Sequence, residues 1–271
     1  MSGFDSRWLA LREPADTAAR DAQLVGQLAD YLAQQGATTL IDIGCGTGST
    51  WRNLTSHVPA DTHWQLLDHD PALLREAERR IGTRDTVIYR QFDLNQVDAL
   101  MLPTHAVVTA SALFDLASET FCAALIERLA AKRCVLYAAL NYDGIMHWSK
   151  AHPLDEAMLA VFNRHQQSEK ELGKALGPAA TGCLEKHLRA KGYHVDVRPS
   201  PWQLDADSDE LQAEFIAGLR RPLLEMADKP RGEIEDWLAF RLSMIRQPGS
   251  LCTVGHTDLI AFPEDLTATG S

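Results

Sequence analysis

The sequence lacks the features of a membrane-embedded or secreted protein. No stretch comes near the roughly 18 consecutive apolar residues of a spanning helix, and residues 1–12 lack the basic stretch and apolar run of a secretory signal. The five cysteines are odd in number and form no Cys-x-x-Cys or Cys/His ligand pattern, which argues against a disulfide framework; they are Cys45, Cys122, Cys134, Cys183 and Cys252. We therefore expect a cytoplasmic protein without a metal ion.

Basic residues are too few for a protein that binds phosphate backbones. There are 26 Lys and Arg against 37 Asp and Glu, and the formal net charge of −11 repels nucleic acid and anionic lipid surfaces unless a local basic patch intervenes. The nearest approach to a basic cluster is Arg75, Arg79, Arg80 and Arg84, whose spacing among acidic residues is typical of a solvated helix face. We expect neither nucleic-acid nor membrane partners.

The sequence does contain an alternation of short apolar runs with amphipathic stretches, from about residue 24 to residue 140. This alternation is typical of βαβ units around a parallel sheet, and it predicts an α/β fold. The predicted strands cover residues 39–43, 64–67, 86–90, 106–109 and 134–140, with helices that begin near Thr50, Pro71, Asn95 and Ser118. A further helix, over residues 18–35 and ending at Gly36, leads into the first strand.

The alternation breaks after residue 140. Residues 141–177 carry aromatic residues, histidines and a helical stretch, and they are expected to form a helical insertion or cap. A helix over 179–191, a strand over 193–197, a helical region over 208–246 that Pro230 interrupts and a last strand over 251–262 complete the chain. With 271 residues we expect a single domain, made of a core over 20–140, the cap over 141–177 and the remaining sheet and helices over 178–262.

A glycine-rich turn follows the first predicted strand, in the segment LIDIGCGTGS over residues 40–49. Without Cβ atoms, Gly44, Gly46 and Gly48 can adopt tight-turn dihedrals and let main-chain amides lie against a ligand at the carboxyl end of the sheet. A dinucleotide site would have the spacing G-x-G-x-x-G beside a pyrophosphate. Here the spacing is G-x-G-x-G, and Asp42 precedes it, which suits a ligand with an ammonium group such as S-adenosylmethionine (SAM).

In this motif the chain resembles the small-molecule type of class I SAM-dependent methyltransferases, whose first strand is followed by an acidic residue, one further residue and G-x-G-x-G. The resemblance covers residues 20 to 140. It implies a Rossmann-like, doubly wound, mostly parallel seven-stranded sheet with the last strand antiparallel. It also implies that SAM is the cofactor and S-adenosyl-L-homocysteine the product, without a metal.

The resemblance further implies which residues hold SAM. An acidic residue at the end of the second strand holds both ribose hydroxyls, and Asp68 occupies that place. After the third strand an Asp accepts a hydrogen bond from the adenine amino group, which points to Asp93, and the loop after the fourth strand faces methionine and acceptor. The complete set of implied cofactor-binding residues is Asp42, Gly44, Cys45, Gly46, Gly48, Asp68, His69, Asp93, Leu94 and Ser111.

The predicted acceptor site lies in the cap, because acceptor-binding elements of this family usually occur in such insertions. Tyr142, Trp148, Asn163 and His165 are the substrate-binding candidates, and His165 is also the candidate general base. The alternative interpretation is that these aromatic residues only pack the cap onto the core. Residues 8–16 are expected to form a lid, since many small-molecule members of the family cover the cofactor with a helix that precedes the sheet.

These observations favour methyl transfer to a small-molecule acceptor, at oxygen or nitrogen rather than at carbon. The sulfonium of SAM is already an activated methyl donor, so the protein need only align a nucleophile and exclude water. Two alternatives stay open. One is a tRNA or protein methyltransferase, and the other is a SAM-binding regulator or scaffold that no longer methylates. A homodimer is compatible with the sequence.

Overall fold

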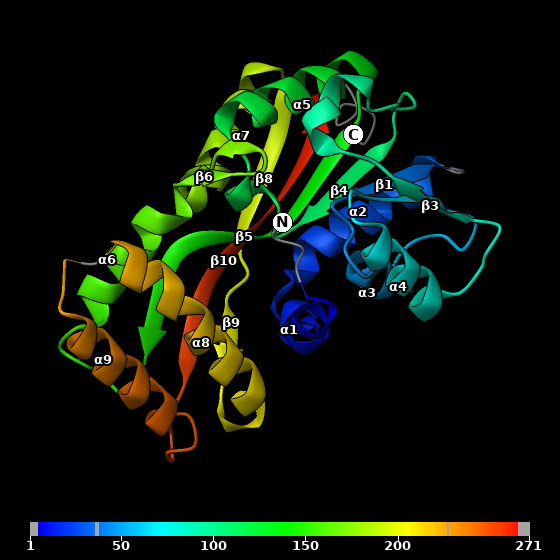
Figure 1. Cartoon of the computed structure of the whole chain (residues 1–271). Coiled ribbons are helices and arrows are strands. Elements are labelled where there is room, and N and C mark those ends of the chain that lie inside the picture. The colour runs from blue at the N-terminus through cyan, green and yellow to red at the C-terminus, as the bar shows by residue number, and fades with distance from the viewer. Residues whose placement is uncertain (1–4, 36–37, 227, 265–271) are drawn as a thin grey trace.

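The computed structural model describes residues 5–35, 38–226 and 228–264, which form a sheet with helices on both faces and a long arm at one side (Figure 1). Within these residues the main path of the sheet runs β3-β2-β1-β4-β5-β10-β8, and β9 pairs with β10 beside it. Its strands are β1 (Thr39–Ile43), β2 (His63–Asp68), β3 (Val87–Gln91), β4 (Val107–Ser111), β5 (Val135–Trp148), β8 (Tyr193–Pro199), β9 (Trp202–Leu204) and β10 (Cys252–Pro263). Strands β1 to β5 run parallel, and β10 is antiparallel to both β5 and β8. The predicted fold is confirmed.

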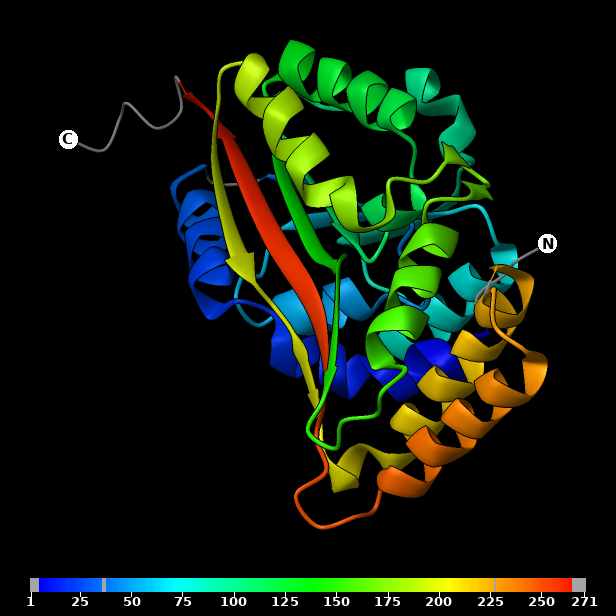
Figure 2. The ribbon, with the colours of Figure 1, turned by 90° about the vertical axis from the view of Figure 1, so that its left-hand side faces the viewer.

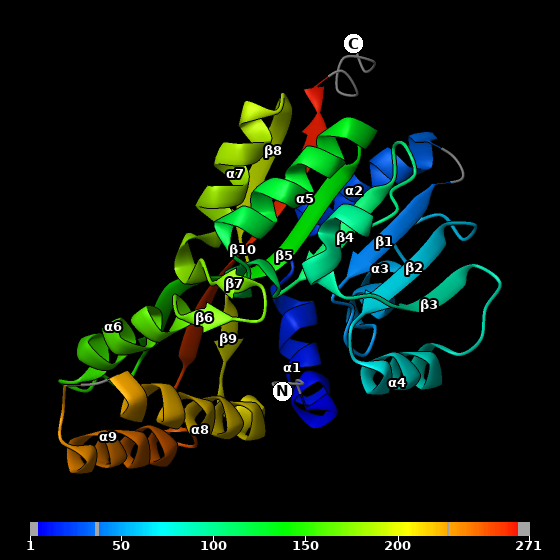
Figure 3. The same ribbon diagram turned by 45° about the horizontal axis from the view of Figure 1, so that its top comes forward.

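Two helical layers cover the sheet (Figure 3). One face carries α2 (Ala22–Gln35), α3 (Ser49–Leu54) and α4 (Pro71–Ile81), and its core contains Leu28 and Leu32 at helical spacing. The other face carries the 3₁₀ helix η1 (Leu94–Ala99), α5 (Glu119–Lys132) and α7 (Ala180–Ala190). No helix within the described residues is both long and apolar enough to cross a membrane.

Local sequence signals fix where the helices begin. The Asp70 side chain accepts a hydrogen bond from the Ala72 amide, and Pro71 stands in the first turn of α4, as predicted. Ser118 caps α5 in the same way, through the Phe121 amide. The helix expected over residues 18–35 begins later, at Ala22, because α1 (Ser6–Ala19) precedes it as a separate helix. Its expected end at Gly36 lies outside the described residues.

The arm is the main departure from the expected organisation. β5 does not stop at residue 140 but continues to Trp148. Residues 141–177, which were expected to form a helical insertion, therefore begin as a strand. It is held there by β10, which pairs with it from Leu136 to Trp148. Tyr142, Met146 and Trp148 lie on the same face of the extension and are buried, which is the two-residue alternation of a half-buried strand.

Helices complete the arm. α6 (Asp155–Gln166), α8 (Asp209–Met226) and α9 (Arg231–Met244) pack with the strand extensions around one apolar cluster (Figure 2). The predicted interruption near Pro230 separates α8 from α9. Short elements fill the connections: β6 (Glu169–Lys170), β7 (Gly173–Lys174) and the 3₁₀ helices η2 (Phe114–Leu116), η3 (Gly177–Ala179) and η4 (Ala206–Ser208). At the far end, buried Arg241 pairs with Asp155 at 2.9 Å. The arm therefore has a core of its own, fastened by an ion pair.

Candidate functional site

The glycine turn lies at the carboxyl end of β1 and has the backbone that the sequence predicted. Gly44, Gly46 and Gly48 have φ angles of 67°, 54° and 80°, in the left-handed region that other residues rarely adopt. Two hydrogen bonds tie the turn to the end of β2: the Cys45 amide donates to the Leu67 carbonyl at 2.9 Å, and the Gly46 amide donates to the Asp68 carboxylate at 2.8 Å. The turn is therefore held in one shape.

The three glycines face different surroundings. A Cβ added to Gly44 would lie 3.3 Å from the Leu113 side chain, and one added to Gly46 would lie 3.2 Å from Leu9 of α1. At Gly48 the Cβ would lie only 2.7 Å from Ile81, whose side chain belongs to α4. Gly48 is therefore required for helix packing, whereas Gly44 and Gly46 border the loop after β4 and helix α1.

Asp42 is buried completely in β1. The Thr109 hydroxyl donates to its Oδ1 at 2.8 Å, while Oδ2 has no hydrogen-bond partner among the described residues. Burial raises the pKa of this carboxyl to about 7, against the smaller opposing effects of the Thr109 hydrogen bond and the Arg20 charge. The acidic residue of the motif therefore lies below the turn, inside the sheet.

Asp68 lies where the second strand ends and is 6% exposed. Its Oδ1 accepts from the Asp70 amide at 2.9 Å and its Oδ2 from Gly46. An ionised carboxylate offers about four acceptor positions, so two hydroxyl donors can still be accommodated. The adjacent His69 is half exposed, with its Nδ1 3.5 Å from Asp68.

Of the other predicted cofactor residues, one caps a helix and two are buried. Asp93 caps η1, because its Oδ1 accepts from the Asn95 amide at 2.9 Å, and Leu94 is buried in the core below it. The Cys45 thiol is also buried, and burial raises its pKa well above the usual value. The amide of Cys45 ties the turn to β2, while its thiol makes only a long contact of 3.7 Å with the Gly46 carbonyl.

Arg20 also lies beside the candidate site, although the sequence alone did not point to it. It follows α1 directly, and its Nη2 donates to the Ser111 hydroxyl at the end of β4, at 3.1 Å. Its Nε and Nη1 atoms are buried and have no hydrogen-bond partner among the described residues. The only local signal was its place beside Asp21, whose carboxylate accepts from the Leu24 amide at the start of α2.

Helix α1 covers the turn. Leu9 packs against Gly46, and Glu13 accepts two hydrogen bonds from Arg52 of α3, at 2.6 and 2.7 Å. About one turn further along the helix, Asp16 accepts from Trp202 Nε1 of β9 at 2.9 Å. The helix thus joins the glycine turn to the arm, and the role of residues 8–16 as a lid stays a prediction.

Further polar side chains gather beyond the end of β4 and beside the middle of β5 and β10. Asp115 accepts from the Tyr142 amide, its Oδ1 is buried without a partner among the described residues, and burial raises its pKa to about 6. The His256 ring lies 5.0 Å from that of Trp202, which in turn lies 5.0 Å from the Arg12 guanidinium carbon. Burial and the Arg12 charge lower the pKa of His256 to about 3, so the ring is neutral at pH 7.

Comparison with known proteins rests on structure alone, because no protein-family model and no curated protein matches the chain. A cyclopropane-fatty-acyl-phospholipid synthase-like protein from Lactobacillus casei is similar over 96% of this chain and 95% of its own, with 16% identity and a TM-score of 0.54. The protein has the class I methyltransferase fold. A SAM-dependent methyltransferase from Geobacter sulfurreducens, in complex with S-adenosyl-L-homocysteine, is similar over 94% of this chain and 98% of its own, with 16% identity and a TM-score of 0.47.

The class I methyltransferase fold explains why the residues above meet. In open α/β sheets, ligands bind outside the carboxyl ends of the strands, where the strand order reverses. Here the order reverses between β1 and β4, which are neighbours in the sheet. The glycine turn follows β1, while Ser111 ends β4 and Leu113 follows it. The candidate cofactor crevice is therefore at this position.

The four acceptor candidates do not lie together in this class I methyltransferase fold. The Tyr142 hydroxyl donates to Asn163 Oδ1 at 2.8 Å, which brings those two side chains together near Asp115. Trp148 instead packs edge-on against Trp237 at 5.7 Å, at the far end of the arm. His165 lies at the contact of α6 with α8, where its Nε2 is 3.3 Å from Glu225.

A cavity of about 1110 Å³ lies between the core and the arm, on the α5 side. Asn95 and Glu119 line it from the core, and Arg164 and Lys174 line it from α6 and the β6–β7 hairpin. Its lining also includes Leu94, but no residue of the glycine turn. It is thus separate from the crevice between β1 and β4.

Asp42→Asn tests the buried carboxyl through the pH dependence of stability. The folded-state pKa of about 7 exceeds the ordinary value of 3.8, so the wild-type protein loses stability as pH rises from about 4 to about 7. Asn mimics the protonated form and can still accept from Thr109. We expect the variant to have the higher Tm at pH 8 and an unchanged Tm near pH 4, measured by scanning calorimetry. A lower Tm of the variant at pH 8 contradicts this account.

Proposed function

We propose that the protein binds SAM in the crevice between β1 and β4 and transfers its methyl group to a small-molecule acceptor. The observation that carries the proposal is the convergence at one sheet edge of a left-handed glycine turn, the Asp68 carboxylate and the Arg20 guanidinium. The fold, which the chain shares with the Lactobacillus casei protein, supports it.

The polar groups of the crevice match the polar groups of SAM. Asp68 would hold the ribose hydroxyls, since it retains acceptor capacity beyond the Gly46 and Asp70 amides. Arg20 would hold the methionine carboxylate, because two of its buried nitrogens lack partners among the described residues and Arg matches carboxylate geometry. Unpartnered buried donors are costly, and an anionic ligand removes that cost.

The acceptor site that we propose lies beyond the end of β4 and beside the middle of β5 and β10, with Asp115, Tyr142, Asn163 and His256 around it. SAM supplies an activated methyl group, so these residues need only orient the acceptor, exclude water and take up a proton. Asp115 suits the role of general base, because its pKa of about 6 leaves it ionised at pH 7 yet basic enough to accept a proton. Neutral His256 is far too weak a base for that role.

A net charge of −11 supports a small acceptor over a nucleic acid. The helical arm, joined to the turn by α1, supports it too, because α1 and the arm together can close over a small molecule. The fold is equally compatible with a SAM-binding regulator, and only detection of a methylated product separates the two.

Gly46→Val and Asp68→Ala test the position of SAM. The first places a branched side chain on the turn, and the second removes the acceptor for the ribose hydroxyls. We expect Gly46→Val to abolish SAM binding and Asp68→Ala to weaken it by about 100-fold or more, measured by isothermal titration calorimetry. Asp70→Ala, which removes only the cap of α4, is the matched control and should leave the affinity within a few-fold. Unchanged SAM affinity in both site variants would show that the site is misplaced.

Arg20→Met separates carboxylate recognition from general damage to the fold. We expect it to weaken SAM binding by about 10- to 100-fold, the usual value of charged hydrogen bonds. Binding of 5′-methylthioadenosine, which lacks the amino-acid part of SAM, should stay unchanged in the same titration. An equal loss for both ligands contradicts the role of Arg20.

Asp115→Asn tests the proposed base. Incubation with SAM labelled in its methyl group and a small-molecule metabolite extract, followed by mass spectrometry, should reveal a product heavier by one methyl group. For that product we expect kcat/KM of the wild type to fall below about pH 6, as Asp115 becomes protonated, and Asp115→Asn to be at least about 100-fold slower with unchanged SAM affinity. His165→Ala, a change at the α6–α8 contact, should keep the wild-type rate. If instead His165→Ala is slow and Asp115→Asn keeps the wild-type rate, then His165 is the base and the assignment to Asp115 is wrong.

A further inference from the structure

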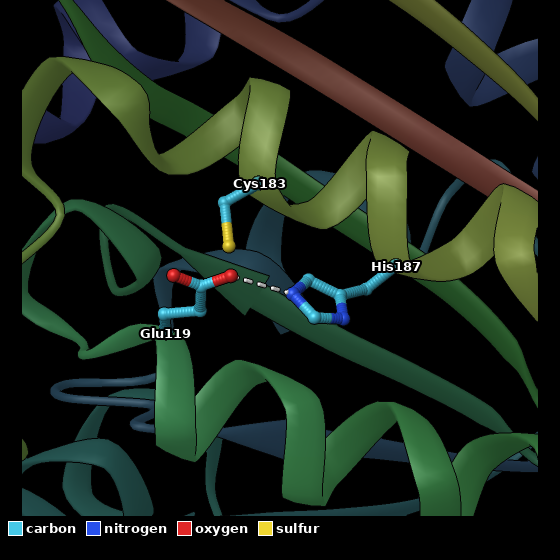
Figure 4. A group of neighbouring side chains, drawn as sticks. All are labelled: Glu119, Cys183 and His187. Atoms are coloured by element: carbon cyan, nitrogen blue, oxygen red, sulfur yellow. Dashed lines mark hydrogen bonds and ion pairs between the residues drawn. The ribbon is translucent and has the colours of Figure 1, made fainter.

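Three potential metal ligands converge on the α5–α7 face of the sheet, outside the cofactor crevice (Figure 4). They are Glu119, the first residue of α5, and Cys183 and His187 of α7. One ligand atom of each lies within 4.8 Å of the other two, and His187 Nε2 is 3.0 Å from Glu119 Oε1. The carboxylate, thiol and imidazole therefore face a common point.

The two helices hold these side chains there. Cys183 and His187 are four residues apart and so lie on the same face of α7, one turn from each other. Next to them Leu184 and Leu188 are fully buried in the cluster that also contains Leu125 of α5. The packing of α5 against α7 thus fixes the separation of the ligands, while Glu119 remains free to turn because its side chain is 57% exposed.

A fourth group supports the thiol. Cys122 lies three residues after Glu119 on α5 and is fully buried, and its thiol and that of Cys183 are close enough to shift each other's pKa. Groups that bond to a metal ligand orient it and raise the affinity of the site. The Cys122 thiol is placed to act in this way on Cys183.

The donor set selects the kind of ion. Mg²⁺ and Ca²⁺ require oxygen ligands, and only Glu119 offers one. Zn²⁺ accepts thiolate sulfur at about 2.3 Å, imidazole nitrogen at about 2.0 Å and carboxylate oxygen, usually with four ligands in a tetrahedron. The corresponding ligand–ligand separations are roughly 3.3–3.8 Å. The three atoms already lie within 4.8 Å of one another, so small rotations of the three side chains would be needed to bind the ion.

We propose that Glu119, Cys183 and His187 form a zinc-binding site, with a water molecule as the fourth ligand on the exposed side. The ion links the first turn of α5 to α7. Because α5 follows the loop that carries Asp115, zinc also anchors the end of that loop. The site does not depend on SAM.

Zinc titration of the full-length, metal-free protein under a thiol-free reductant tests the proposal. We expect one Zn²⁺ per chain, with Cys183→Ser and His187→Ala weakening the affinity by at least about 100-fold, since loss of a ligand costs more than loss of a supporting group. Zinc should raise the Tm of the wild type and not that of these two variants. His194→Ala, which removes an exposed histidine of β8, is the matched control and should bind like the wild type.

Cobalt(II), which can replace zinc, provides a spectroscopic test. Its spectrum changes only if these residues bind the ion, and not if they merely stabilise the fold. The wild type and Cys122→Ser should show the intense visible bands of a tetrahedral ion and a thiolate charge-transfer band, and Cys183→Ser should lose the latter. The proposal is overturned if zinc does not bind stoichiometrically, or if Cys183→Ser and His187→Ala bind it as the wild type does. It is also overturned if the reduced protein does not bind zinc and mild oxidation instead forms a disulfide between Cys122 and Cys183.

Discussion

The hydrogen bond from the Gly46 amide to the Asp68 carboxylate is the constraint on which the site depends. It holds a turn of left-handed glycines against the end of the neighbouring strand, while the Cys45 amide bonds to Leu67 beside it. Asp68 is thereby fixed at the crevice with its acceptor capacity partly unused. One carboxylate thus shapes the turn, and in the proposed function the same carboxylate holds the ligand.

Helix α1 connects this turn with the rest of the proposed site. Leu9 covers Gly46 and Glu13 pairs with Arg52, while Asp16 binds Trp202 at the base of the arm. Arg20 follows the last residue of this helix, and its guanidinium donates to Ser111 at the end of β4. Any movement of α1 would therefore affect the glycine turn and the base of the arm together, as the proposed lid would require.

The elements that depend on short sequence patterns could be predicted: the strands of the parallel sheet, the start of α4 at Pro71 and the glycine turn all arise within a few residues. Arg20, Asp115 and His256 could not be identified, because their importance comes from burial beside groups far away in the chain. The extension of β5 to Trp148 was missed for the same reason, since β10 supplies its hydrogen bonds. Likewise, Cys183 and His187 gain their partner Glu119 only when α5 and α7 pack together.

A crystal structure of the protein with S-adenosyl-L-homocysteine tests the central claim most directly. The account predicts ligand density across the turn at Gly44 and Gly46, with the ribose on the Asp68 carboxylate and the amino-acid carboxylate on Arg20. The account is contradicted if, at saturating ligand, Leu9 still fills this crevice. It is also contradicted if the ligand binds elsewhere and makes no contact with Asp68 or Arg20.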